Sequence, residues 1–170
     1  LAKEQNAAPG AITFESHPQS LFSSAVPPLL NTLRDRQRLL AEYGMKKVLA
    51  FPVTKKVMST YWRDFLDSLV EQGAVGFVCG DDFRFGNRGE GNGQLLMRYC
   101  TEKGLPCVLV PEQTKDGTRI SSTYIRRQIE EGHMATALNF LGHPHVLSGE
   151  VVSGRQLGRT IGVPTANLRL

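Results

Sequence analysis

The chain has 170 residues, enough for one good hydrophobic core and part of a second. Its composition, 41% apolar and 21% charged, is that of an ordinary globular protein, and no stretch approaches the roughly 18 consecutive apolar residues of a membrane span. The net charge of +4 comes from basic residues that are spread along the chain. Composition therefore argues against both a membrane protein and a nucleic-acid-binding protein.

Short apolar runs alternate with amphipathic segments over most of the chain. Strands are expected at 11–14, 47–53, 74–79 and 107–110, and helices at 31–43, 60–71 and 93–102. Asn31 is the expected N-cap of the first of these helices. This alternation predicts an α/β fold, a Rossmann-like parallel sheet with helices on both faces.

The segment Ile-Ser-Ser-Thr-Tyr-Ile-Arg, 120–126, places hydroxyl groups and a cation at an expected helix start. A short strand is predicted at 118–120 and a helix at 123–131, with Ser122 or Thr123 as the N-cap. The unpaired N–H groups of a helix N-terminus suit a phosphate group, and Arg126 can add a guanidinium to the same anion. The segment alone is also compatible with an ordinary capped helix.

Two other polar segments follow predicted strands. His17-Pro18 comes after 11–14 and is compatible with a simple turn, whereas the glycine-rich segment 80–93 comes after 74–79 and is compatible with a flexible surface loop. Phe83 and Phe85 in this second segment are costly to expose, so we expect it to fold back and pack, with 86–92 as a mobile lid. Ligands bind beyond the carboxyl ends of parallel strands, so the three segments predict one site.

The pattern of apolar residues and glycines changes after a short helix expected at 135–141. From Val146 apolar residues alternate and glycine is frequent, which predicts antiparallel β structure and a new module. The predicted division is therefore 1–141 and 142–170. The cysteines Cys79, Cys100 and Cys107 have no metal-ligand spacing and are odd in number, which predicts reduced thiols in the cytoplasm.

Four segments together resemble a known family. TFESHP at 13–18, GDDFRFG at 80–86, ISSTYIR at 120–126 and GRTIGVPTANL at 158–168 are similar to the motifs of bacterial bifunctional FAD synthetases, in the same order. The resemblance implies a nucleotidyltransferase sheet followed by the start of a riboflavin kinase β-barrel. It also implies two reactions, phosphorylation of riboflavin to FMN and adenylyl transfer from ATP to FMN, with Mg²⁺.

The resemblance also implies roles for individual residues. The leaving pyrophosphate would be stabilised by Ser121, Ser122, Thr123 and Arg126. Flavin or nucleotide contacts would come from His17, Pro18, Asp82, Phe83 and Phe85. In the kinase module, Gly158 and Gly162 would let the backbone approach phosphate, and Thr165 and Asn167 would be oxygen ligands of Mg²⁺.

One expected motif of the family is missing from this sequence. No His-x-Gly-His segment occurs, although it binds the ATP phosphates in the family. We therefore expect the chain to be an internal piece of a longer enzyme and to make little or no FAD by itself. The alternatives are a catalytically silent flavin- or nucleotide-binding regulatory module, and a related nucleotidyltransferase with another acceptor.

Overall fold

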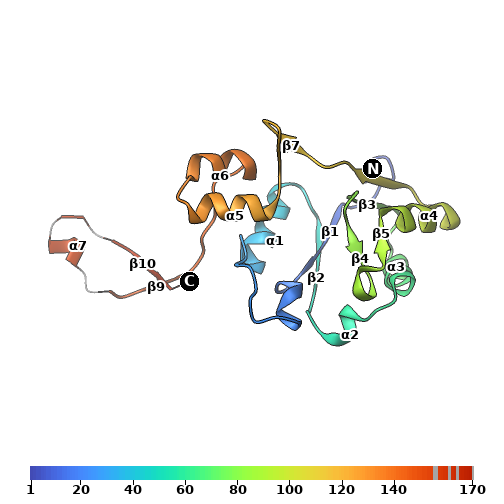
Figure 1. Ribbon diagram of the computed structural model, residues 1–170, viewed down its shortest axis with the longest axis horizontal. Coiled ribbons are helices and arrows are strands. Elements are labelled where there is room, and N and C mark those ends of the chain that lie inside the picture. Colours follow the sequence, from blue (N-terminus) through green and yellow to red (C-terminus); the bar gives the residue numbers. More distant parts are fainter. Residues whose placement is uncertain (155–156, 161, 164, 170) are drawn as a thin grey trace.

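The computed structural model describes residues 1–154, 157–160, 162–163 and 165–169. Figure 1 shows an α/β body followed by a strand pair that lies at one end of the molecule. The strands of the body are β1 Gly10–Phe14, β2 Lys47–Phe51, β3 Phe77–Gly80, β4 Arg84–Phe85, β5 Gly91–Asn92, β6 Cys107–Val110, β7 Thr114–Lys115 and β8 Thr118–Arg119. Its helices are η1 Pro18–Leu21, α1 Leu33–Glu42, α2 Lys55–Met58, α3 Trp62–Glu71, η2 Asn87–Gly89, α4 Gly93–Lys103, α5 Ser122–Glu130 and α6 Met134–Leu141.

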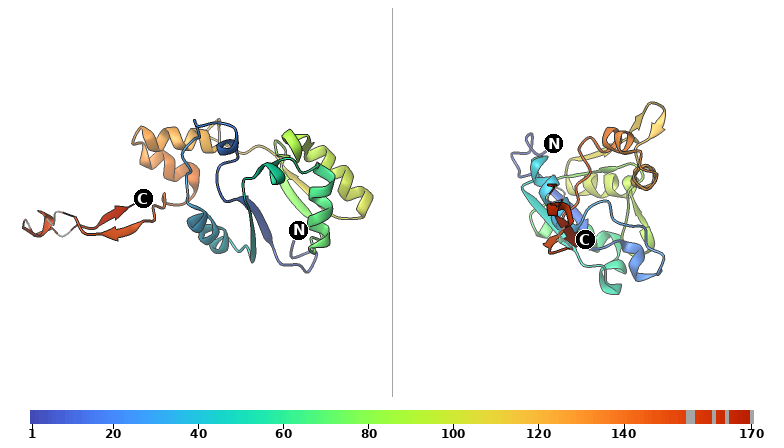
Figure 2. Two further views of the ribbon diagram at one scale, coloured as in Figure 1. Left: turned by 90° about the horizontal axis from the view of Figure 1, so that it is seen from below. Right: turned by 90° about the vertical axis from the view of Figure 1, so that its left-hand side faces the viewer.

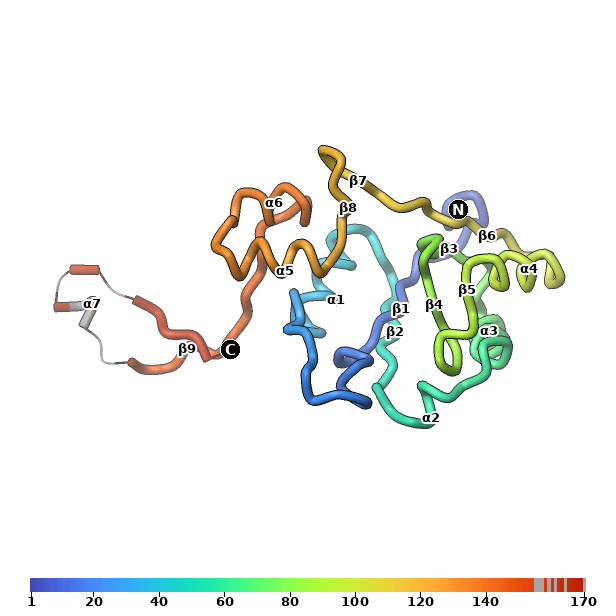
Figure 3. The backbone as a smooth tube through the Cα atoms, in the orientation of Figure 1, coloured from blue at the N-terminus to red at the C-terminus, as the bar shows by residue number. Residues whose placement is uncertain are grey.

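The predicted parallel pairing is confirmed, in two separate pairs. β1 pairs with β2 in the register Gly10↔Lys47, and β3 pairs with β6 in the register Phe77↔Cys107. Within the described part of the chain these pairs are not joined into one continuous sheet. Each pair is connected through a helix, α1 in the first case and α4 in the second, as parallel strands require. Figure 3 shows this path of the backbone.

The expected helices are present; α4 starts at the expected residue, and the others start one or two residues away from the expected position. α1 is capped by Thr32, whose Oγ1 accepts from the N–H of Asp35 at 3.1 Å, so the prediction of Asn31 as the cap is wrong by one residue. The short helix α2 was not expected, because four residues are too few for a periodic pattern to show.

The core of the body lies between α3, α4 and the strand β4. Its buried residues are Leu66, Phe85, Leu96, Tyr99 and Cys100. α4 packs over β3 and β6, which places the three cysteines in the interior or close to it. All three are free cysteines in the structure, and burial raises the pKa of Cys100 to about 12.

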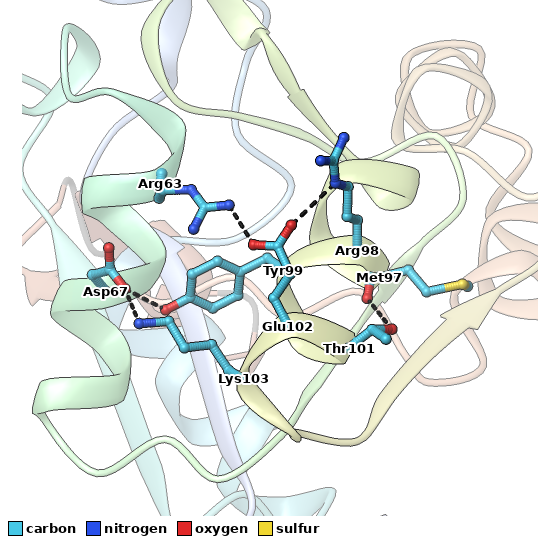
Figure 4. Close-up of polar contacts among 8 residues, drawn as sticks. All are labelled: Arg63, Asp67, Met97, Arg98, Tyr99, Thr101, Glu102 and Lys103. Carbon is cyan, nitrogen blue, oxygen red and sulfur yellow. Dashed lines mark hydrogen bonds and ion pairs between the residues drawn. The ribbon is translucent and has the colours of Figure 1, made fainter.

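Polar side chains join α3 to α4 at the edge of this core (Figure 4). The Tyr99 hydroxyl donates to Asp67 at 2.7 Å, and Lys103 reaches the same carboxylate at 3.0 Å. Arg63 donates to Glu102 at 2.5 Å. These donors lower the pKa of both carboxyl groups, chiefly through the hydrogen bonds from Tyr99 to Asp67 and from Arg63 to Glu102.

A glycine fixes the hairpin of β4 and β5 against α3. Gly86 has φ +75°, and a Cβ added to it would lie 2.7 Å from the Cα and the Cβ of Trp62. The Glu90 carboxylate accepts from the N–H of Trp62 at 3.1 Å. The segment predicted to be a mobile lid, 86–92, is therefore mostly regular structure packed on α3, because backbone contact and a helix-end hydrogen bond hold it there.

The region after α6 forms an antiparallel strand pair, as predicted, but only from Glu150. β9 Glu150–Val152 pairs with β10 Asn167–Arg169, and the short helix α7 Leu157–Thr160 lies between them. Figure 2 shows this pair extending from the body in a second view. Its described strands do not close a barrel. Across the described residues, no helix combines the length and apolar character needed to traverse a lipid bilayer.

The first prediction concerns acid. A lowered native pKa means that the unfolded chain binds more protons, so Asp67 and Glu102 contribute stability above their ordinary values of 3.8 and 4.5, and this contribution is lost as pH falls through the native values. We expect the urea midpoint, followed by fluorescence of the single tryptophan, to fall more in the wild type than in D67N/E102Q between neutral pH and about pH 3.

The control for this prediction is D64N/E71Q, which changes two α3 carboxylates that have no ion pair within the described residues. It should keep the acid sensitivity of the wild type. Equal losses in the wild type and in D67N/E102Q would contradict the assignment.

The second prediction concerns Gly86. Gly86→Ala should lower the free energy of unfolding by about 2–4 kcal/mol, because a left-handed conformation and a backbone clash add together. Gly104→Ala isolates the conformational cost, since Gly104 has φ +66° with no atom within 4 Å of an added Cβ. The free energy of unfolding of Gly104→Ala should be lower than that of the wild type by roughly 1 kcal/mol. Equal losses in urea titrations would show that the Trp62 contact is not tight.

Candidate functional site

A cavity of about 570 Å³ lies where β1 and β2 end. It is bordered by the start of η1, the chain before α1, the hairpin of β4 and β5, and the start of α5. From the predicted site residues its lining includes His17, Pro18, Phe83, Phe85, Ser122 and Arg126. The three segments expected to meet at one site therefore do meet, although they are far apart in sequence.

The wall of the cavity is aromatic on one side. Phe51 and Phe65 make an edge contact with ring centroids 5.9 Å apart, and Phe65 lies 6.0 Å from Phe85. Phe83 stacks on Phe85 at 5.4 Å with an angle of 19° between the rings. Phe85 is buried and Phe83 is 41% exposed, so Phe83 remains accessible to a flat ligand.

Arginine side chains supply the charge around the cavity. Arg36 donates to the hydroxyl of Thr13 at 2.6 Å and to the carbonyl oxygen of Phe14 at 2.9 Å. Arg84 and Arg126 also line the cavity, and no carboxylate does so among the described residues. An aromatic wall with unopposed positive charge suits a ligand that combines a planar ring and phosphate groups.

The start of α5 differs by one residue from the prediction. Ser121 is the N-cap, with extended backbone (φ −145°, ψ 149°), and its Oγ accepts from the N–H of Tyr124 at 3.2 Å. Ser122 is already helical, so the prediction of Ser122 or Thr123 as the cap is wrong. Ser121 and Thr123 do not line the cavity, whereas Ser122 does.

The strand before this helix is also different from the prediction. β8 pairs with β7 in an antiparallel hairpin and does not belong to either parallel pair, because Asp116 and Gly117, both at positive φ, turn the chain back at once. The ISSTYIR segment nevertheless reaches the cavity. Arg126 is held there by its Nε, which donates to the carbonyl oxygen of Pro28 at 2.6 Å.

His17 follows the strand β1 after Glu15 and Ser16 and caps the short helix η1. Its Nδ1 accepts from the N–H of Gln19 at 3.2 Å, so the proton of a neutral ring lies on Nε2. Pro18 occupies the first helical position, where its missing N–H costs nothing. The ring of His17 is thus set at the cavity as a hydrogen-bond donor.

Asp82 does not line the cavity. Its carboxylate pairs with Arg119, which also binds Glu112 at 3.1 Å. This ion-pair cluster ties the loop after β3 and the chain after β6 to the hairpin that precedes α5. The expected contact of Asp82 with a ligand therefore stays a prediction.

Several residues of the cavity lining have no distinctive pattern in the sequence. Arg36 lies among other charged residues on α1, and Asn31 has the residue type of a helix cap. The sequence does not single out Arg36 because a solvated charge and a cavity-lining charge have the same pattern on one helix, and it does not single out Asn31 because a polar residue just before a helix has the pattern of a cap. A smaller cavity of about 440 Å³ shares Met58, Gly86 and Gly89 with the first and adds the exposed ring of Phe22.

The residues predicted for the kinase module lie apart from this cavity. Gly158 belongs to α7, Gly162 has φ +74°, and Thr165 and Asn167 are exposed around β10. Thr165 and Asn167 have neutral oxygen atoms, a type of ligand that Mg²⁺ accepts. Among the described residues no group of three or more His, Cys, Asp or Glu side chains could hold a metal ion.

Two family models match the chain. The FAD synthetase model matches residues 1–124, and the riboflavin kinase model matches residues 141–170. These matches confirm the resemblance drawn from the four sequence segments.

Named relatives agree with the family models. The bifunctional riboflavin kinase/FMN adenylyltransferase of Escherichia coli (strain K12) is 40% identical over 160 residues, which are 92% of this chain and 51% of the relative. The protein of the same name from Listeria monocytogenes is 32% identical over 173 residues, with 100% and 55% covered. The chain spans about half the length of these curated relatives.

A solved structure has the same fold. A crystal structure described as a macrolide-efflux protein from Streptococcus pneumoniae matches with a TM-score of 0.83 and 27% sequence identity, over 99% of this chain and 55% of that one. The fold, the convergence of three motif segments on one cavity and a family model that covers well over half of the residues agree. The chain belongs to the FAD synthetase family.

Proposed function

We propose that this chain acts in FAD biosynthesis, by transfer of the adenylyl group of ATP to FMN with release of pyrophosphate. The observation that carries the proposal is the composition of the cavity, an aromatic wall beside arginine side chains with no carboxylate in the described lining. The flat ring system of a flavin suits the wall, and the phosphates of FMN and ATP suit the guanidinium groups.

The reaction does not require the protein to form a covalent bond with the substrate. A phosphate oxygen of FMN is already anionic and forms a bond to the α-phosphorus of ATP, while the bond from that phosphorus to the pyrophosphate breaks. Catalysis then consists of positioning and charge stabilisation. Ser122 and Arg126 line the cavity near the positive end of α5 and would bind the leaving pyrophosphate. Ser121 and Thr123 adjoin them on the same helix start.

The flavin would be held on the other side of the cavity. Phe83 and Phe85 offer a stacked pair of rings, and Nε2 of His17 offers a hydrogen-bond donor. Mg²⁺ bound with ATP would share the charge of the phosphates. These contacts need no titratable base, which fits a cavity whose lining holds no carboxylate among the described residues.

The remainder of the proposal follows the riboflavin kinase match. We divide the chain into an adenylyltransferase part, 1–141, and the beginning of a kinase part, 142–170, that forms FMN from riboflavin and ATP in the cytoplasm. Gly158, Gly162, Thr165 and Asn167 are its proposed nucleotide and Mg²⁺ contacts. The match to the riboflavin kinase model over 141–170 supports this division.

The third prediction tests the flavin side. Phe83→Leu should weaken FMN binding about 2- to 13-fold, equivalent to about 0.5–1.5 kcal/mol for one aromatic contact. Quenching of FMN fluorescence measures the affinity. Tyr61→Leu is the matched control, because Tyr61 is similarly exposed at 48% and does not line the cavity. Equal affinities of F83L and the wild type for FMN would show that the ring of Phe83 does not contact the flavin.

The fourth prediction separates adenylyl transfer from simple flavin storage. Adenylyl transfer requires the triphosphate of magnesium ATP to bind beside FMN, so the FMN-loaded chain should bind magnesium pyrophosphate in calorimetry, and Arg126→Ala should weaken that binding about 10- to 100-fold. Arg127→Ala is the control, because Arg127 lies over the ring of Tyr124, on the same helix and outside the cavity lining. Tight FMN binding without any pyrophosphate binding would favour the silent regulatory module.

A further inference from the structure

The chain before α1 forms one wall of the cavity but lacks support of its own. Leu29, Leu30 and Asn31 line the cavity, within the irregular stretch 24–31. Among the described residues, this stretch makes no backbone–backbone hydrogen bond, and Nδ2 of Asn31 is buried without a partner. Such a stretch keeps one conformation only if other parts of the chain hold it.

Two side chains from distant positions supply that support. Nε of Arg126 donates to the carbonyl oxygen of Pro28 at 2.6 Å, and Nε2 of His145 lies 2.9 Å from the carbonyl oxygen of Leu30. Since a carbonyl oxygen only accepts, His145 is the donor and carries its proton on Nε2. His145 lies beyond α6, in the segment 142–149 that leads to β9.

The same segment also holds the beginning of α1. The Ser148 hydroxyl donates to Oδ1 of Asp35 at 2.5 Å, and the hydroxyl of Thr32 donates to Oδ2 at 2.7 Å. Asp35 is only 4% exposed, and the two hydroxyls lower the pKa of its carboxyl group, that of Ser148 more than that of Thr32. The next residue, Arg36, enters the cavity lining, so the contact at Asp35 fixes the turn of helix that carries Arg36.

We propose that His145 and Ser148 are positioning residues for the cavity of the adenylyltransferase part, supplied by the segment that leads into the riboflavin kinase part. They hold the wall 24–31 and the first turn of α1 in the conformation that lines the ligand site. The effect on ligands rests on the proposed function, because it takes the cavity to be the FMN site. The effect on the wall does not.

The test compares H145A/S148A with the control H133A/S153A, which changes the same residue types at exposed positions outside the wall. Chymotryptic cleavage after Leu29 and Leu30 reports the wall, quenching of FMN fluorescence reports the cavity, and fluorescence of Trp62 in urea reports the fold of the body. We expect cleavage to rise about tenfold and FMN affinity to fall about tenfold in H145A/S148A only, with an unchanged urea midpoint.

Conservative variants keep the test decisive. H145Q/S148T retains a donor at both positions and should restore cleavage and affinity to near the values of the wild type, which a loss of packing alone would not. If H145A/S148A unfolds, the single variant S148A replaces it. Wild-type cleavage in the alanine variants overturns the proposal, and so does faster cleavage with unchanged FMN affinity. If the wild type itself does not bind FMN, the proposed function fails, while cleavage still decides the role in the wall.

Discussion

The structure of the site depends on the packing of Phe85. This ring is buried in the core with Leu66, Leu96 and Tyr99, and it is also part of the cavity wall. The hydrophobic contacts that stabilise α3 and α4 therefore also fix the aromatic side of the site. The backbone contact between Gly86 and Trp62 also holds the hairpin of β4 and β5 against α3. The aromatic wall is therefore as tightly packed as the core.

The opposite side of the cavity is built differently. Its stretch before α1 is held by side chains, one from α5 and one from the segment beyond α6. Side-chain contacts of this kind open more easily than a packed core. The cavity thus combines a rigid aromatic wall with a wall whose position depends on later parts of the chain, and Arg126 belongs to both the support of that wall and the candidate phosphate site.

Some features were readable from single segments. The parallel strands and the helices between them follow from local apolar patterns, and the structure confirms them. The expected packing of the phenylalanine-containing loop is confirmed for Phe85, whereas Phe83 remains 41% exposed. The errors have a local cause too. A run of Ser-Ser-Thr offers three caps of similar quality, and only backbone conformation selects Ser121. β7 and β8 are only two residues long each, which is too short to show a periodic pattern. The sequence therefore does not distinguish this hairpin from a strand of the parallel sheet.

What the sequence by itself determined is the family, the α/β class and the motif residues that converge on one cavity, because each depends on residue type and order along a short segment. Only the tertiary structure decided that Arg36 and Asn31 line the cavity, that Asp82 is paired with Arg119, and that His145 and Ser148 reach across to α1. The physical reason is that these contacts join residues far apart in sequence. The residues next to a donor, a carboxylate or a loop carbonyl do not indicate which distant group it will bind.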